Sequence, residues 1–115
     1  MQRLLCQFFR FVKFHAAVLS LIRETTEAAR EAGIHVCVCG EIAGDPVYAP
    51  LLIGLGVQEL SMSAASLGMI RRVIRRLKLH EAEELAQQAL HSRTASETQA
   101  LATEFVRSIA PDLVS

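Results

Sequence analysis

The sequence has no excess charge of either sign and few aromatic residues. Its 115 residues include 12 Lys and Arg and 12 Asp and Glu, so the formal net charge is zero. A neutral chain has no field that attracts a nucleic-acid backbone or an anionic membrane surface. Aromatic residues, on which bases stack in many nucleic-acid binders, make up only 5%. The composition therefore predicts no nucleic acid among its partners.

Cysteines and long apolar runs are also scarce. The three cysteines are Cys6, Cys37 and Cys39. An odd number of cysteines argues against a disulfide framework, and Gln7, Arg10 and Lys13 interrupt the apolar N-terminal residues that an export signal would need. These features predict a reducing, cytoplasmic environment. No stretch reaches the roughly 18 uninterrupted apolar residues of a membrane-spanning helix, so we expect no membrane insertion.

The length and the 51% content of hydrophobic residues fit one domain that buries most of its apolar surface. Residues 16–32 place their apolar side chains on one stripe, which predicts an amphipathic helix that ends at Gly33. Residues 34–39 alternate between two faces and predict a buried strand. The Asp-Pro pair at residues 45–46 indicates the start of a short helix that closes at a glycine within residues 54–56.

A second strand is predicted over residues 57–63, and a helix over residues 64–78 follows it. Because a helix connects the two strands, they must run parallel, and helices should cover both faces of their sheet. The expected fold class is therefore α/β. The side chains expected to face inward from the helix over residues 64–78 are Leu67, Ile70, Val73, Ile74 and Leu77.

Two further helices are predicted at the end of the chain, over residues 80–91 and 94–110. Thr94 and Glu97 have the spacing of a capping box, in which each side chain accepts a hydrogen bond from a backbone amide of the first turn. The apolar stripe expected on the last helix consists of Leu101, Phe105 and Ile109.

Four arginines gather on one flank of the helix over residues 64–78. They are Arg71, Arg72, Arg75 and Arg76, at a spacing that could grip a phosphate group or a nucleic-acid backbone. The alternative is a solvated helix face beside the acidic residues Glu81, Glu83 and Glu84. We favour the solvated face, because the chain lacks the basic charge and interleaved aromatics of nucleic-acid binders.

His35, Cys37 and Cys39 share one face of the first predicted strand and raise the possibility of a metal site. Consecutive residues on one strand face lie about 6.6 Å apart, and structural zinc usually needs four convergent ligands from two segments. No second cluster of Cys or His follows, so we expect no metal site here. His80 and His91 stand alone on helices and are expected to be surface residues.

Cys39 is expected at the carboxyl end of a strand, before a glycine-containing turn. Substrates bind at this edge in parallel α/β folds. Three motifs lie around it: "HAAVLSLI" at residues 15–22, "VCGEIAGDP" at residues 38–46 and "LLIGLGVQELSMS" at residues 51–63. Together they resemble the C-terminal part of the phosphoenolpyruvate–protein phosphotransferases, the Enzyme I family of the bacterial sugar phosphotransferase system. Pyruvate phosphate dikinase and phosphoenolpyruvate synthase share the Cys-Gly turn.

The resemblance implies a partial (β/α)8 TIM barrel. Residues 15–79 would supply its last two parallel strands with flanking helices, and residues 80–115 would form a C-terminal helical tail of the same domain. Residues 1–14 resemble nothing in that family and stay unassigned. One departure lies inside the match, because Ala16 stands where the family motif has proline.

The resemblance also implies an activity. The family binds phosphoenolpyruvate and Mg²⁺, passes the phosphoryl group to a protein histidine for sugar uptake, and works with a phosphocarrier protein. Cys39 matches the cysteine that protonates the pyruvate enolate, whereas Cys37 does not. A thiol is mostly protonated near neutral pH and can act as such an acid. Carboxylates such as Glu41 and Asp45 would raise the pKa of the Cys39 thiol, whereas a helix N-terminus would lower it. The sequence does not decide which effect is larger.

Two classes of function stay open. The chain can be a C-terminal fragment of a phosphotransferase, inactive alone because the phosphohistidine domain, the phosphate-gripping arginines and the magnesium ligands lie outside the match. It would then work as a homodimer or with a chain that carries the rest of the barrel. The alternative is a non-catalytic relic or a dimerisation and interaction module. The DNA upstream discriminates the two, since a continuation with barrel motifs would favour the enzyme.

Overall fold

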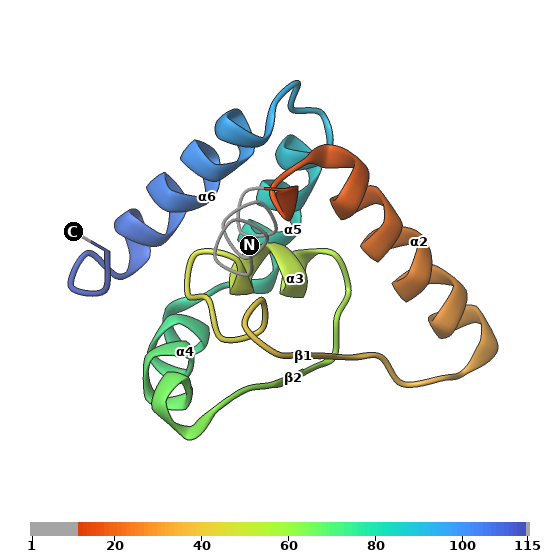
Figure 1. The fold of residues 1–115 in the computed structure, drawn as a ribbon, viewed down its shortest axis with the longest axis horizontal. Coiled ribbons are helices and arrows are strands. Elements are labelled where there is room, and N and C mark those ends of the chain that lie inside the picture. The colour runs from red at the N-terminus through yellow and green to blue at the C-terminus, as the bar shows by residue number, and fades with distance from the viewer. Residues whose placement is uncertain (1–11, 115) are drawn as a thin grey trace, which may run out of the picture.

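The structure, a computed structural model, describes residues 12–114. Its elements in chain order are α2 (Ala16–Ala32), β1 (Cys37–Cys39), α3 (Ala49–Gly54), β2 (Glu59–Ser61), α4 (Ala64–Arg76), α5 (Leu79–Leu90) and α6 (Ala95–Ile109) (Figure 1). Cys6 and the apolar N-terminal residues 1–11 lie outside the described residues. Across the described part of the chain, no helix combines the length and apolar character needed to cross a membrane.

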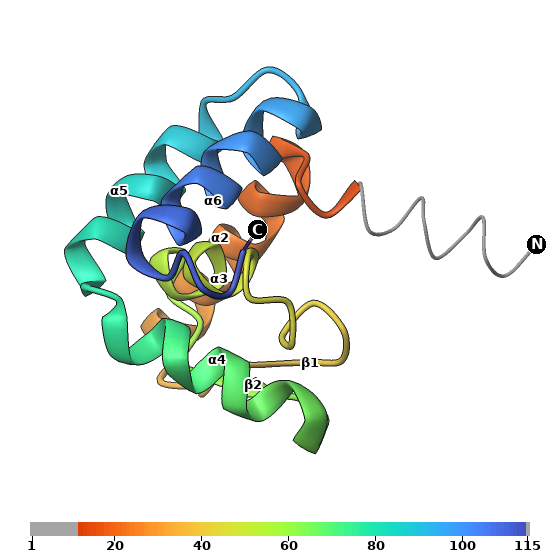
Figure 2. The same cartoon turned by 90° about the vertical axis from the view of Figure 1, so that its left-hand side faces the viewer.

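The two strands pair in parallel, as the helical connection between them predicts. Cys37 aligns with Glu59, and Cys39 aligns with Ser61. The strands lie at one end of the molecule, away from the turn that joins α5 to α6 (Figures 1 and 2). Helices outnumber strands in residues 12–114, and this mixed architecture is compatible with the α/β class. The partial barrel stays a prediction.

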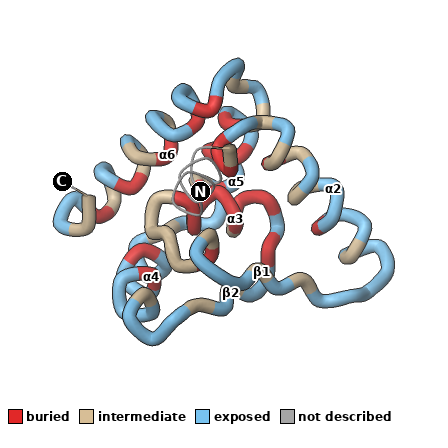
Figure 3. The backbone as a smooth tube through the Cα atoms, viewed as in Figure 1, coloured by how far each residue is buried: buried red, intermediate tan, exposed pale blue. Residues whose placement is uncertain are grey.

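The strands are shorter and more exposed than the sequence predicts. Each has three residues and is coloured mostly as exposed in Figure 3. The residues that bear the thiols, Cys37 and Cys39, are both exposed. Ile34, expected inside the first strand, lies before it with 63% of its surface exposed. Val38 and Leu60 pack against the main core from the other face. The expectation of helices on both faces was therefore wrong, because the described residues place packed elements against one face only.

The main core forms around α3 and the turn before it. Tyr48, Leu51 and Leu52 are fully buried there, and Leu19 of α2 and Leu85 of α5 belong to the same apolar cluster. Burial of such side chains is the dominant favourable contribution to folding. The red segments of Figure 3 lie around α3 and along the facing sides of α5 and α6. The short helix α3 is thus the centre of the molecule.

Helix α2 confirms the prediction for residues 16–32. His15 caps its first turn, with Nδ1 accepting a hydrogen bond of 3.0 Å from the Ala17 amide. Gly33 ends it in the left-handed conformation with φ of 70°, where residues with a side chain are strained. Thr26 of this helix is buried, and its hydroxyl donates a hydrogen bond of 2.6 Å to the Leu55 carbonyl. This bond fastens α2 to the end of α3.

The helix predicted from the Asp-Pro pair begins later than expected. The side chain of Asp45 accepts a hydrogen bond of 2.9 Å from the Val47 amide, and its carbonyl accepts one from Ala49. Asp45 and Pro46 therefore form a turn, and α3 begins only at Ala49. A proline lacks the amide that helix interiors need, and Pro50 fits because it lies in the first turn of α3.

Helix α4 buries less of its apolar surface than predicted. Ile70 and Val73 are buried, but Leu67 and Ile74 are 39% and 43% exposed. Both were expected to face inward, and that expectation was wrong. Periodicity identifies the apolar side of a helix, but it does not say how much of that side a neighbour covers.

Helix α6 confirms the Thr94 cap, with one difference in the capping box. The Thr94 hydroxyl accepts a hydrogen bond of 3.1 Å from the Glu97 amide, whereas the Glu97 carboxylate accepts one of 3.0 Å from the Arg93 amide. The buried stripe is also offset by one residue from the prediction. The fully buried side chains are Thr98, Ala102 and Val106, and the expected Leu101, Phe105 and Ile109 are half-buried beside them.

All four arginines of α4 are exposed. The acidic partner of one of them differs from the expectation. Nη1 of Arg76 donates a hydrogen bond of 2.5 Å to Asp112, which follows α6 in the chain. This hydrogen bond holds the pKa of the Asp112 carboxyl below its ordinary value. No ion pair within residues 12–114 joins this cluster to Glu81, Glu83 or Glu84.

Candidate functional site

Cys39 is the last residue of β1, and its side chain is exposed. Gly40 follows with φ of 90°, which residues with a side chain rarely adopt, so the chain can turn away directly after the thiol. Because the strands are parallel, Ser61, the last residue of β2, lies at the same edge of the sheet. The structure therefore places Cys39 at the carboxyl edge, as the sequence predicts.

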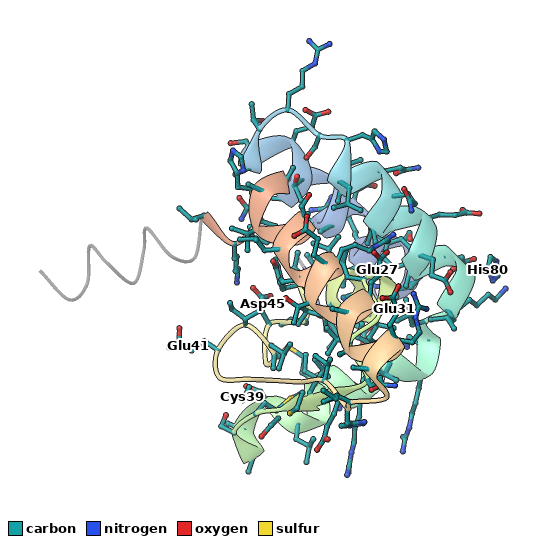
Figure 4. All side chains as sticks on the ribbon, turned by 90° about the vertical axis from the view of Figure 1, so that its right-hand side faces the viewer. Glu27, Glu31, Cys39, Glu41, Asp45 and His80 are labelled. Carbon is teal, nitrogen blue, oxygen red and sulfur yellow. The ribbon has the colours of Figure 1, made fainter. Side chains whose placement is uncertain are left out.

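The segment after Cys39 carries two carboxylates in different surroundings. In Figure 4, Cys39, Glu41 and Asp45 follow one another along this segment. Glu41 is exposed, whereas Asp45 is half-buried and forms an ion pair with Lys13. The carboxylate of Asp45 is thus neutralised by a cation of the chain itself.

Lys13 is a residue of this site that the sequence reasoning missed. It is only 8% exposed, and its ammonium lies 5.3 Å from the centre of the Phe14 ring and 5.4 Å from that of the Tyr48 ring. A desolvated cation over aromatic faces is stabilised by the ring quadrupoles. The signal available in the sequence was a lysine between Val12 and Phe14, since a charge inside an apolar run needs a partner.

Tyr48 also contacts Lys13. Its hydroxyl donates a hydrogen bond of 2.6 Å to the backbone carbonyl of Lys13. Burial, together with the negative charge of Asp45, raises the pKa of the Tyr48 phenol far above its ordinary value. The phenol therefore stays protonated and keeps its role as donor at any physiological pH.

A cavity of about 410 Å³ opens beside this network. The residues that line it are Lys13, Phe14, Glu41, Asp45, Val47, Ser66 and Gln99. Cys39 does not line it, but Glu41, two residues along the chain, does. The cavity thus lies on the carboxyl side of the sheet, where the sequence predicts a substrate, and it is lined by one cation and two carboxylates.

The second thiol of the strand has a different environment. Cys37 is aligned with Glu59, whose carboxylate also contacts Nε2 of His35 at 2.9 Å. Desolvation, together with the charges of Glu59 and Cys39, raises the pKa of the Cys37 thiol above its ordinary value. The surroundings of Cys37 therefore disfavour its thiolate form.

The side chains of this edge do not form a metal site. Within residues 12–114, no group of three His, Cys, Asp or Glu side chains is arranged to hold a metal ion. Asp45, one of the two carboxylates that line the cavity, is already paired with Lys13. The residues that the structure describes therefore offer no ready set of ligands for the Mg²⁺ that the resemblance implies. His80 and His91 are exposed on or beside α5, as predicted.

The chain is similar to known proteins over most of its length. Residues 4–79 match the family described as PEP-utilising enzyme, PEP-binding domain. A phosphoenolpyruvate-protein phosphotransferase of Staphylococcus carnosus is 37% identical over 99 residues, which are 86% of this chain and 17% of that protein. One of Mycoplasma pneumoniae is 38% identical over 99 residues, again 86% of this chain and 17% of the relative.

A multiphosphoryl transfer protein of Xanthomonas campestris pv. campestris is 46% identical over 87 residues, which are 76% of this chain and 10% of that protein. The chain thus spans less than a fifth of the length of these relatives.

Proposed function

The chain belongs to the PEP-utilising enzymes, and from this premise we propose that it supplies the C-terminal part of a phosphotransferase that takes the phosphoryl group of phosphoenolpyruvate. The acceptor of the phosphoryl group is a histidine of a protein. The enzyme works in the cytoplasm with a phosphocarrier protein for sugar uptake. The names of the relatives, phosphoenolpyruvate-protein phosphotransferase and multiphosphoryl transfer protein, support this substrate and this type of acceptor.

Cys39 is the acid of the proposed reaction. After the phosphoryl group leaves, the S–H bond of Cys39 breaks. Its proton forms a new C–H bond with the methylene carbon of the enolate, which becomes the methyl group of pyruvate. The thiolate regains a proton from solvent, to which the side chain is open. The observation that carries this role is the exposed thiol at the carboxyl end of β1, directly before the turn at Gly40.

The rest of the catalytic apparatus comes from outside this chain in our proposal. Phosphoryl transfer needs cations around the phosphate. Among the described residues, the only cation that lines the cavity with Glu41 is Lys13, which Asp45 already neutralises. We therefore expect the chain to be inactive alone and to work as a homodimer or with the remaining part of a (β/α)8 barrel. Mg²⁺ would belong to the complete enzyme, on ligands that this chain does not provide.

One observation favours a second candidate, an interaction module without catalysis. The face of the sheet that bears Cys37 and Cys39 is open, and both strands have an unpaired edge within the described residues. Unpaired strand edges and exposed apolar side chains are surfaces for association. A relic of the enzyme that kept only its association surfaces would show the same features.

A chimeric enzyme tests the proposal against this alternative. The 99 residues of this chain that align with the Staphylococcus carnosus phosphotransferase replace their counterparts in that enzyme. We expect the chimera to release pyruvate from phosphoenolpyruvate and to become phosphorylated on a histidine. A folded chimera of native mass that does neither would contradict the catalytic proposal and leave the interaction module. The full chain alone, measured beside it, should release no pyruvate.

A further inference from the structure

The strand β1 carries two thiols on one face. Cys37 and Cys39 are its first and last residues, and both are exposed and free of disulfide bonds. Val38 between them packs against the main core from the other face. Residues two apart in a strand lie on the same face, about 6.6 Å from each other. Cys39 is also one of the causes, after desolvation and Glu59, of the raised pKa of the Cys37 thiol. The two thiols are therefore neighbours on an open surface.

This spacing is too wide for a disulfide bond. A disulfide needs its two Cβ atoms about 3.5–4.5 Å apart, whereas side chains on one face of a strand leave the backbone nearly in parallel. Closing the bond would bend β1 out of its register with β2, in which Cys37 aligns with Glu59. An ion between two thiolates fits the strand better. Two metal–sulfur bonds of about 2.3 Å in a line span about 4.6 Å, so each sulfur need lean only about 1 Å toward the other.

The number of ligands decides which ion suits the pair. Zn²⁺ in structural sites takes four protein ligands, and Mg²⁺ and Ca²⁺ take six or more, mostly oxygen atoms. Within residues 12–114, no group of three His, Cys, Asp or Glu side chains is arranged for such an ion. His35, two residues before Cys37, is engaged by the Glu59 carboxylate at 2.9 Å from its Nε2. Two thiolates alone satisfy a soft monovalent ion such as Cu(I), for which thiolate is a preferred ligand.

We propose that Cys37 and Cys39 together bind one Cu(I) ion as a two-coordinate dithiolate. Both S–H bonds break, two S–Cu bonds form, and the two protons go to solvent, while copper keeps its oxidation state. Both residues are exposed, so the ion reaches them without a change of fold. The proposal does not rest on the function proposed for Cys39. Where Cys39 also acts as the acid, the two uses exclude each other, because a thiolate bound to copper has no proton to give.

The experiment is an anaerobic titration of the full chain with Cu(I), in competition with the chromophoric chelator bathocuproine disulfonate. We expect one Cu(I) ion per chain. X-ray absorption at the copper edge should show two sulfur neighbours at about 2.3 Å and no nitrogen neighbour. Both measurements also work on a self-associated protein. Three or more sulfur neighbours, or a nitrogen neighbour, would contradict the two-coordinate site.

The same substitution at each of the three cysteines of the chain locates the ion. Cys37→Ser and Cys39→Ser should each weaken Cu(I) binding by at least about a hundredfold, because the second thiolate acts at a high effective concentration. Cys6→Ser, which removes a thiol outside β1, should leave the affinity unchanged. Far-UV circular dichroism checks each fold, and the copper-edge spectrum of the unchanged chain decides if a serine variant does not fold.

Two results of the titrations would overturn the proposal. Weakening by Cys6→Ser as large as that by the strand variants would assign the ion to other thiols. Half an equivalent of Cu(I) kept at full affinity by Cys37→Ser or Cys39→Ser would mean that the ion bridges two chains instead of two residues of one strand.

Discussion

Tyr48 donates a hydrogen bond of 2.6 Å to the backbone carbonyl of Lys13, which lies 35 residues earlier in the chain. The same lysine forms an ion pair with Asp45, three residues before the tyrosine. Two bonds of different kinds thus join the segment before α2 to the turn that follows Cys39. Tyr48 and Lys13 are both buried, so the hydrogen bond between them is shielded from water.

Tyr48→Phe should lower the free energy of unfolding by about 1–3 kcal/mol, because it leaves the carbonyl of Lys13 buried without a donor. The ring itself and its edge-to-face contact with Phe14 would remain. Urea denaturation followed by circular dichroism measures the change. Ser108→Ala is the control, because that hydroxyl is exposed and should matter by less than about 0.5 kcal/mol. Equal midpoints for the two variants would show that the phenol contributes nothing.

Gly54→Ala should be among the most destabilising single substitutions in the chain. An added Cβ would lie 2.1 Å from the Ala82 carbonyl oxygen, which belongs to the backbone of α5 and cannot move aside alone. The two helices would have to separate, at a cost of about 1–3 kcal/mol or more. Gly68→Ala on α4 is the matched control. No atom lies within 4 Å of its added Cβ, and helix propensity predicts a gain of up to about 1 kcal/mol.

Thermal unfolding of the two alanine variants would separate these effects. The close approach of α3 and α5 predicts that only Gly54→Ala unfolds at a markedly lower temperature. A loss of similar size at Gly68 would mean that both glycines are needed for their backbone and not for the space beside them.

The parts of this fold that the sequence predicts are those with local signals. Gly33 ends α2 and Thr94 begins α6 because a single residue type meets the needs of a helix end. The parallel pairing followed from the helix between the strands. The ion pair of Lys13 with Asp45 depends on two segments that meet only in the folded chain, and no local pattern marks it.

Exposure is the other property that patterns predicted poorly. Cys37, Cys39 and Ile74 follow apolar periodicities as well as the buried Val73 does, yet they face solvent. A period identifies a face of a strand or helix, and only the neighbouring elements decide whether that face is covered.

Glu59→Gln should make Cys37 more reactive near pH 8. The carboxylate of Glu59 is one cause, after desolvation, of the raised pKa of the Cys37 thiol. Removing its charge lowers that pKa, so more thiolate is present, and the alkylation profile shifts to lower pH. Iodoacetamide labelling with tandem mass spectrometry measures Cys37 separately. Glu41→Gln, beyond Gly40, is the control and should leave the Cys37 profile in place. An unshifted profile in Glu59→Gln would exclude this charge as a cause.

Arg76→Met should raise the pKa of Asp112 toward its ordinary value. The hydrogen bond from Arg76 is the main reason for the lowered pKa. A lowered carboxyl pKa stabilises the fold above the pKa of the unfolded chain, and this contribution is lost as pH falls through the folded value. Both groups are exposed, so the effect on stability is small. A carbon-13 NMR titration of Asp112 checks the shift, and Arg71→Met on the same helix should leave it unchanged.

The two thiols of β1 should differ in their effect on the chimeric phosphotransferase. Cys39→Ala should slow pyruvate formation by about 10²- to 10⁴-fold, the usual cost of losing a positioned general acid. Cys37→Ala should slow pyruvate formation far less, because Cys37 is the first residue of β1 and does not lie at the carboxyl end of the strand.

The order of steps gives this test a second readout. The phosphoryl group leaves phosphoenolpyruvate before the enolate is protonated, so a single turnover should still phosphorylate the histidine in the Cys39 variant. Rapid-quench sampling of phosphoprotein and pyruvate from the same reaction would then show phosphoprotein forming well ahead of pyruvate. A merely structural role for Cys39 would slow both products together. Equal effects of Cys39→Ala and Cys37→Ala on pyruvate would refute the assignment, since the two alanines remove the same group from the same face of one strand.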